Sequence, residues 1–347
     1  MSQVTCSNSP SPLPKVSIVL PYKDEEKTLH EAVISLVKQD YSGPIEILAV
    51  NDGSKDDSTE ILKHLASEYS ALRLIEHTVS GVAAARNAAL SEASGQVIVN
   101  FSAHAFACDY FLRVLVEKLT SVSSCVAGVG CKHVPAPNDS SISRAFGTAM
   151  RSTLGGLGTT YRQADVERFV ESVAFTAYRA ELFRIIGEFD SSVVGNEDGE
   201  FNLRVRKAGY RLLYSPEAIV YHHEVSSPLA FLRKMIRYGE GRARTIRKHP
   251  WSFRFVHACP CVALLALVFL SIGGLFDVRL LQILIGLITT YIICVLVSAL
   301  AHVRSICLPA LIIAFPIIHL GYGVGFIGGF FRSKRSESSE RRPQAQT

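Results

Sequence analysis

The stretch Ile45-Glu46-Ile47-Leu48-Ala49-Val50-Asn51-Asp52-Gly53-Ser54 decides the fold class, because a run that favours a buried strand ends abruptly in a polar turn. The same order occurs upstream, where the β-branched run 15–21 leads into Tyr22-Lys23-Asp24-Glu25. Two further strands are expected at 72–76 and 96–101. The first hundred residues therefore read as a series of short strands, each followed by a polar turn or a helix.

Helices are expected between these strands. Apolar residues recur at helical spacing in 25–39, a further helix is expected at 58–69, and 82–93 reads as an alanine-rich helix. Alternating strands and helices predict an α/β fold with a mostly parallel sheet flanked by helices. Ligands bind such sheets beyond the carboxyl ends of the strands. The polar turns that follow the strands, including Ser102-Ala103-His104 after 96–101, should meet at one edge and form a nucleotide site.

The surplus of apolar residues lies at the C-terminal end. Of 347 residues, 48% are hydrophobic and only 19% are charged, where an ordinary soluble domain has about 25% charged. This composition excludes a disordered or collagen-like chain. Segments 255–276 and 280–301 contain no Asp, Glu, Lys or Arg, and each is long enough to cross a bilayer. Segment 305–331 is equally uncharged, but Pro316 and its glycines leave open a re-entrant pair in place of a third span.

Basic residues on both sides of the apolar region bear on its orientation. Those before the first span are Arg233, Lys234, Arg237, Arg242, Arg244, Arg247, Lys248 and Arg254. This cluster predicts a cytoplasmic side, and the basic tail from Arg332 predicts the same side for the tail. Three full crossings would place the tail on the other side, so either the third segment does not cross or the upstream cluster overrides the tail.

The chain divides by composition into five parts. These are a disordered start (1–14), an α/β domain (15–228), a basic amphipathic interfacial helix (229–254), a membrane region of two or three spans (255–331) and a polar tail (332–347). The eight cysteines show no zinc spacing, so we expect reduced and mostly buried thiols. A net charge of +5 is modest, and we expect no nucleic-acid partner.

Several ordered motifs resemble the family 2 glycosyltransferases of the GT-A fold. They are Val19-Leu20-Pro21-Tyr22-Lys23-Asp24-Glu25, Val50-Asn51-Asp52-Gly53-Ser54, Gly81-Val82-Ala83-Ala84-Ala85-Arg86-Asn87, and the acidic pair Gly187-Glu188-Phe189-Asp190 and Asn196-Glu197-Asp198-Gly199-Glu200. The resemblance covers about residues 15–250. Ala103-His104-Ala105, Tyr178-Arg179 and Arg206-Lys207-Ala208-Gly209-Tyr210 most resemble the membrane-bound exopolysaccharide (succinoglycan-type) branch of the family. It implies that 15–228 is a GT-A catalytic domain.

The resemblance also implies an activity. An inverting enzyme of this kind would move a sugar from a nucleotide-diphosphate donor, with a UDP-sugar expected, to a lipid-linked or saccharide acceptor. It would act in glycan or exopolysaccharide biosynthesis as a multi-pass membrane protein whose catalytic domain is cytoplasmic. Two alternatives stay open, a polyprenyl-phosphate sugar synthase and a catalytically inactive GT-A-like binding protein.

The donor is expected at the ends of the strands. Asp52 would accept hydrogen bonds from the edge of a uracil-like ring, with Tyr22 packing near the ring and Pro21 fixing the turn. Arg86, near the start of the alanine-rich helix, would pair with phosphate oxygens. The other predicted donor-site residues are Glu25, Ser102 and His104. A solvated turn aspartate and a surface ion pair are the alternatives for Asp52 and Arg86.

Asp198 is the predicted general base, with Glu197 beside it in the same catalytic site. Sugar transfer with inversion requires a carboxylate to remove the acceptor hydroxyl proton as the anomeric carbon is attacked. The following run 201–208 is amphipathic and would anchor the acidic motif. The alternative is a solvated acidic turn without a catalytic role.

The chain departs from the family at the metal position. The family usually carries two aspartates separated by one residue after the fourth strand, where this chain has Ser102-Ala103-His104. His104 is therefore the predicted metal ligand, with His222 and His223 as further candidates. Imidazole suits Mn²⁺ better than Mg²⁺. Structural histidines are the alternative, so the resemblance implies a divalent metal that this substitution puts in question.

The basic segment before the first span has two compatible interpretations. Arg233 and Arg237 are spaced four residues apart and would lie on one helix face, along the membrane surface. Arg237 or Arg242 could equally reach the diphosphate of a donor or of a lipid carrier. The sequence thus predicts a helix that links the nucleotide site to the membrane.

Overall fold

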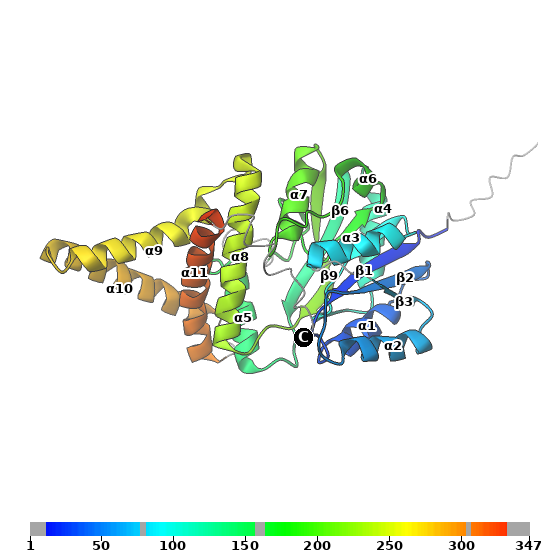
Figure 1. Ribbon diagram of the computed structural model, residues 1–347, viewed down its shortest axis with the longest axis horizontal. Coiled ribbons are helices and arrows are strands. Elements are labelled where there is room, and N and C mark those ends of the chain that lie inside the picture. The colour runs from blue at the N-terminus through cyan, green and yellow to red at the C-terminus, as the bar shows by residue number, and fades with distance from the viewer. Residues whose placement is uncertain (1–11, 77–80, 157–163, 303–306, 332–347) are drawn as a thin grey trace, which may run out of the picture.

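The computed structural model describes residues 12–76, 81–156, 164–302 and 307–331, so most of the predicted disordered start and the whole polar tail lie outside the described residues. An α/β body carries a group of long helices at one side (Figure 1). The bounds of the nine strands are β1 (Val16–Tyr22), β2 (Ile45–Asn51), β3 (Leu72–Ile75), β4 (Val97–Asn100), β5 (Ala105–Ala107), β6 (Val126–Pro135), β7 (Arg168–Val170), β8 (Ala177–Arg179) and β9 (Arg211–His222).

These strands form one mixed sheet in the order β3-β2-β1-β4-β8-β6-β9-β5, with β7 paired to β9. β1 is parallel to β2 and to β4, and β2 is parallel to β3. β8 runs antiparallel to β4 and β6, whereas β6 and β9 are parallel. The carboxyl ends of β1, β2 and β4 therefore meet at one edge, as the sequence predicts.

Helices cover both faces of the sheet. One face carries α1 (Leu29–Val37), α2 (Ser58–Glu68) and α4 (Phe111–Ser121), and the other carries α3 (Val82–Glu92), α6 (Glu181–Ile186) and α7 (Glu197–Lys207). Alternation along β1 explains this, because Ile18 and Leu20 pack into the first layer while Val19 packs against α3. All three residues are almost fully buried.

The predicted helix 25–39 begins later, at Leu29. The preceding turn is tied to the neighbouring loop, because the backbone N–H groups of Asp24, Glu25 and Glu26 donate to the side chains of Ser54, Ser58 and Asp56. These bonds hold residues 24–26 outside the helix. They also join the loops after β1 and β2 into one rigid edge.

The C-terminal half contains α5 (Ser141–Arg151), α8 (Pro228–Lys248), a short 3-10 helix (Pro250–Ser252), α9 (Phe255–Gly273), α10 (Val278–Ala301) and α11 (Leu308–Phe331). Three of these, α9, α10 and α11, are long and apolar enough to cross a membrane. α11 is one helix that includes Pro316 and the glycines, so the re-entrant pair left open by the sequence is not formed. α8 lies between α11 and the α/β body, and α9 and α10 extend away as a hairpin (Figure 1).

Candidate active site

The loops after β1 and β2 form one side of the site. Asp52 donates its backbone N–H to the carbonyl oxygen of Tyr22 at 2.9 Å, and its carboxylate accepts a hydrogen bond from the backbone N–H of Gly81. Asp52 therefore fixes the start of α3. The side chain of Tyr22 is only 3% exposed, and its hydroxyl lies 3.3 Å from that of Thr59. The Tyr22 ring therefore lies in the core at the end of β1, and buried Pro21 precedes it in the same strand.

A carboxylate, a guanidinium and an amide meet at the centre of the site. The Arg86 guanidinium donates to the two carboxylate oxygens of Asp198, from Nη1 at 3.0 Å and from Nη2 at 3.5 Å. Asn100, at the end of β4, donates its amide to Asp198 Oδ1 at 2.6 Å. Three chain segments far apart in sequence thus converge on the predicted general base. Arg86 is 5% exposed, whereas the Asp198 side chain is 32% exposed and reaches solvent.

The guanidinium of Arg86 has partners within the protein. It is engaged with Asp198 and lies over the ring of Phe189, 5.1 Å from the ring centre. Within the described residues, Arg86 Nε and Asn100 Oδ1 are buried without a hydrogen-bond partner. In this structure Arg86 therefore holds Asp198 in place.

Glu197 turns back into its own loop. Its carboxylate accepts the backbone N–H of Gly195 at 2.9 Å. Burial raises the pKa of Glu197 above its ordinary value, and the positive charge of Arg86 opposes that rise. Glu197 and Asp198 are neighbours in sequence but occupy different surroundings, and Asp198 is the one joined to Arg86 and Asn100.

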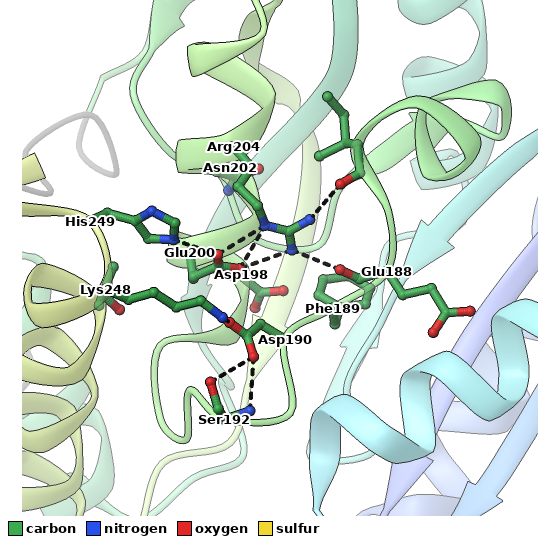
Figure 2. Close-up of polar contacts among 12 residues, drawn as sticks. Glu188, Phe189, Asp190, Ser192, Asp198, Glu200, Asn202, Arg204, Lys248 and His249 are labelled. Carbon is green, nitrogen blue, oxygen red and sulfur yellow. Dashed lines mark hydrogen bonds and ion pairs between the residues drawn. The ribbon is translucent and has the colours of Figure 1, made fainter. Parts of the chain in front are cut away.

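A buried ion cluster fixes the start of α7 (Figure 2). Glu200 is fully buried and pairs with Arg204 at 2.9 Å and with His249 at 2.8 Å. Arg204 also donates to the carbonyl oxygens of Ile186 and Glu188, at 2.9 and 2.7 Å. The cluster holds the first turn of α7, which bears Asp198, between the loop before it and the end of α8. Sequence reasoning missed it, although the spacing of Glu200 and Arg204 is that of a helical ion pair.

α8 packs directly against the acidic loop. A Cβ at Gly241 would lie 2.6 Å from the carbonyl oxygen of Val194, so the two backbones are in contact. Asn196 donates its amide to the Thr245 hydroxyl at 2.8 Å. Arg237 is exposed and packs against Gly195, which has a φ of 86° and leaves room for its stem. The structure therefore brings Arg237 to the site.

Arg242, the other predicted diphosphate residue, faces a different part of the molecule. Its guanidinium lies beside the hydroxyl of Tyr322 in α11 and near His257 in α9. It contacts the apolar helices and does not join the group around Asp198. Lys248, which sequence reasoning did not single out, forms an ion pair with Asp190 of the acidic motif (Figure 2).

The predicted metal ligands are only partly brought together. Pairing of β5 with β9 places Ala105 opposite His222, and the rings of His104 and His222 meet edge to face with centres 4.9 Å apart. His104 Nδ1 also lies 2.8 Å from Glu25. His223 instead places its two ring nitrogens against Asp139 and Glu31, at 2.7 and 3.0 Å. His223 therefore has two carboxylate partners within the protein, whereas His104 and His222 lie together at the sheet edge.

These residues do not fit a preformed metal site. Across the described ranges, no three His, Cys, Asp or Glu side chains are arranged to hold an ion. Ser102 occupies the position where the family carries its first aspartate, and it is partly buried at the same edge. The donor set at this edge is thus reduced to His104, His222 and Glu25, with one nitrogen of His104 already engaged by Glu25.

Comparison with known proteins agrees with this geometry. Residues 17–187 match glycosyl transferase family 2, and residues 109–327 match glycosyl transferase family group 2. The chain is 27% identical over 236 residues to the succinoglycan biosynthesis protein ExoA of Rhizobium meliloti (strain 1021), which covers 67% of this chain and 70% of that protein.

A second relative aligns over nearly the whole chain. It is the dolichyl N-acetyl-alpha-D-glucosaminyl phosphate 3-beta-D-2,3-diacetamido-2,3-dideoxy-beta-D-glucuronosyltransferase of Methanococcus voltae, 25% identical over 326 residues, with 91% of this chain and 96% of that protein covered. Among solved structures, the fold is similar to the mannosyltransferase PcManGT from Pyrobaculum calidifontis in complex with GDP-Man and Mn²⁺. That match has a TM-score of 0.59 and 18% identity, and it covers 93% of this chain and 88% of that one.

The second family match covers more than half of the chain and includes the acidic loop, α7 and α8. The mixed sheet flanked by helices and the strand-end site agree with it. The chain therefore belongs to the family 2 glycosyltransferases and has their GT-A fold.

Proposed function

We propose that this glycosyltransferase moves a sugar, with inversion, from a nucleotide-diphosphate donor to a lipid-linked acceptor at the cytoplasmic face of a membrane. The observation that carries the proposal is the position of Asp198. It is a partly exposed carboxylate at the carboxyl edge of the sheet, held by Arg86 and Asn100 and enclosed on its far side by α8.

In the proposed reaction, Asp198 accepts the proton of the acceptor hydroxyl while that oxygen forms a bond to the anomeric carbon. The bond from that carbon to the donor phosphate breaks, and the nucleoside diphosphate leaves with the electron pair. Attack from the face opposite the leaving group inverts the configuration. Arg86 and Asn100 fix the direction of the carboxylate, since both donate to it.

The donor would bind at the strand ends and beside α8. Asp52 and His104 lie at the strand ends, with Glu25 and Ser102 beside them, and Arg237 projects from α8 next to the acidic loop. Arg237 is an exposed cation next to the acidic loop that could pair with the leaving diphosphate. Arg242 is left with an interfacial role.

A membrane-bound acceptor is supported by the helices and by one relative. Three helices of this chain are apolar enough for a bilayer. The Methanococcus voltae relative, which aligns over 91% of this chain, is named for action on a dolichyl phosphate-linked sugar. A lipid-linked acceptor would reach Asp198 past α8, which touches both α11 and the acidic loop.

The test is a screen of UDP- and GDP-sugars against membranes that contain the full-length protein, with mass detection of lipid products and with Mn²⁺ present or chelated. A new sugar on a lipid-linked saccharide supports the proposal. A single sugar on a polyprenyl phosphate would instead identify a polyprenyl-phosphate sugar synthase. Absence of any product and of any nucleotide binding would favour a binding protein that has lost catalysis.

A further inference from the structure

The three apolar helices differ in how the protein covers them. In their most apolar stretches, 17% of α9 and 11% of α10 is buried, against 50% of α11. α9 and α10 form a hairpin that extends away from the body, and α11 runs beside α8 (Figure 1). At 1.5 Å per residue, α10 is about 36 Å long and α9 about 29 Å, which is close to the thickness of a hydrocarbon core of about 30 Å, and both lengths fall in the usual range of a span.

α11 and α8 are in register along a seam of small residues. Gly321 lies against Leu232 and Met235, Gly325 against Ile236, and Gly329 against Glu240 and Ala243. Each step of four residues along α11 matches a step of four along α8. The two helices therefore run in the same direction side by side, with backbones close enough that a Cβ at these glycines would collide.

α8 cannot lie in the hydrocarbon, because it is strongly charged. Its side chains reach α11 within this seam, since Arg247 donates to the carbonyl oxygen of Gly329 at 3.2 Å and Glu240 lies beside Gly328. Charged side chains inside a bilayer are costly and require polar partners or water. Because α11 packs along α8 through this seam, α11 must lie at the same depth relative to the membrane as the charged side chains of α8.

The first half of α11 is held by the α/β body as well. Phe315 and Ile318 are almost fully buried, in a cluster with Phe146 of α5 and Phe231 of α8. His319 bonds through Nε2 to the carbonyl oxygen of Leu154, in the segment after α5. α11 is thus packed along its length against α8, and its first half also contacts α5 and the segment that follows α5. The exposed side chains of α11 are all apolar: Pro309, Ile313, Leu320, Val324, Phe330 and Phe331.

We propose that only α9 and α10 cross the bilayer, and that α11 lies in the plane of the membrane surface between α8 and the lipid, with Ile313, Leu320 and Val324 inserted into the interface. The pair of helices together is amphipathic, with the apolar side chains of α11 toward the acyl chains and the charged helix α8 behind it, as a single interfacial helix is on its two faces. It also places the segment before α9 and the chain after α11 on one side of the membrane.

The charges of the sequence favour the same topology. Two crossings put the basic residues of α8 on the side of the tail, which contains Arg332, Lys334, Arg335, Arg341 and Arg342. The loop between α9 and α10, on the other side, is flanked by one acid and one base, Asp277 and Arg279. Basic residues concentrated on one side are the pattern expected of a cytoplasmic side. Three crossings would divide the two basic clusters between opposite sides.

The test uses the full chain with protease-cleavable epitope tags at three places, before Met1, after Phe276 and after Thr347. Digestion is compared in intact cells and in inverted membrane vesicles, and size-exclusion in detergent checks that each tagged protein is folded. We expect the first and last tags to be digested together, in the same preparation, and the tag after Phe276 to be digested in the other.

A tag after Thr347 that is digested in the preparation opposite to the tag before Met1 would overturn the proposal, because α11 would then cross. Digestion of all three tags from one side would also overturn it, because the hairpin would not cross. The pair of terminal tags by itself distinguishes an even from an odd number of crossings, so three crossings are tested even where insertion after Phe276 prevents folding.

Discussion

Replacement of Asp198 by Asn tests the proposed base while keeping the shape of the side chain. Loss of a positioned general base lowers a rate by about 10²–10⁴-fold, and we expect transfer to fall in that range. Stability should fall less than for a fully buried pair, whose disruption costs about 3–5 kcal/mol. Asp198 is 32% exposed, and Asn keeps one oxygen for the Arg86 contact at 3.0 Å, so we expect a loss of about 1–3 kcal/mol.

The assay measures sugar transfer per folded molecule, donor binding by calorimetry, and unfolding in detergent. Asp40→Asn is the matched control, because Asp40 pairs with Arg113 at 3.1 Å on the surface, far along the chain from the site, and should leave all three unchanged. Transfer at the wild-type rate in Asp198→Asn would refute the role of base. Loss of donor binding together with transfer would show that Asp198 holds the donor, which also contradicts the mechanism.

Three further changes test other parts of the structure. Glu197→Gln should raise the melting temperature at pH 7. The pKa of Glu197 is raised in the folded protein, so this residue contributes stability at low pH, and the contribution is lost as the pH rises through the folded-state pKa. The gain in melting temperature should vanish below about pH 4, and a gain that does not depend on pH would contradict this reasoning. Burial opposes ionisation of Glu46, but hydrogen bonds from Ser17, Ser94 and Lys15 lower its pKa from 4.5 to about 2. Glu46→Gln should therefore lower the free energy of unfolding by about 3 kcal/mol at pH 7, and by progressively less as the pH falls from 4.5 toward 2. Equal losses at pH 7 and at pH 2 in denaturant unfolding would refute this explanation. Gly325→Val should separate α11 from α8 and lower the melting temperature, whereas Gly286→Val, at a position with open space, should leave the α8–α11 seam unchanged; equal losses in the two variants would contradict the close contact.

The local signals in the sequence are sufficient for β1 to β4 and for the edge where their loops meet, but not for β5 to β9. Strand-end turns such as Asn51-Asp52-Gly53-Ser54 predict where the loops meet, since parallel strands share their carboxyl edge. The sequence also placed Asp198 in an acidic motif before an amphipathic helix, and the structure shows it in the first turn of α7.

The partners of these residues could not be predicted, because they depend on packing between segments far apart in sequence. Arg86 and Asp198 are 112 residues apart, and nothing local indicates that the guanidinium turns to that carboxylate. His223 follows His222 directly, yet the pleat of the strand sends it to Asp139 and Glu31 while His222 meets His104. Asn100 was overlooked although it ends β4, where the rule for strand-end polar residues would have found it.

The seam between α8 and α11 also constrains how the molecule is made. α5 and α8 are synthesised well before α11, yet α11 covers the buried faces of Phe146, Phe231 and Met235. A fragment that stops before Phe255 lacks α11 and would present these side chains to water, so we expect it to aggregate. In the cell, the catalytic domain would complete its folding only after α11 packs against α5 and α8. Its folding would therefore depend on prior insertion of the hairpin of α9 and α10, which precedes α11 in the chain.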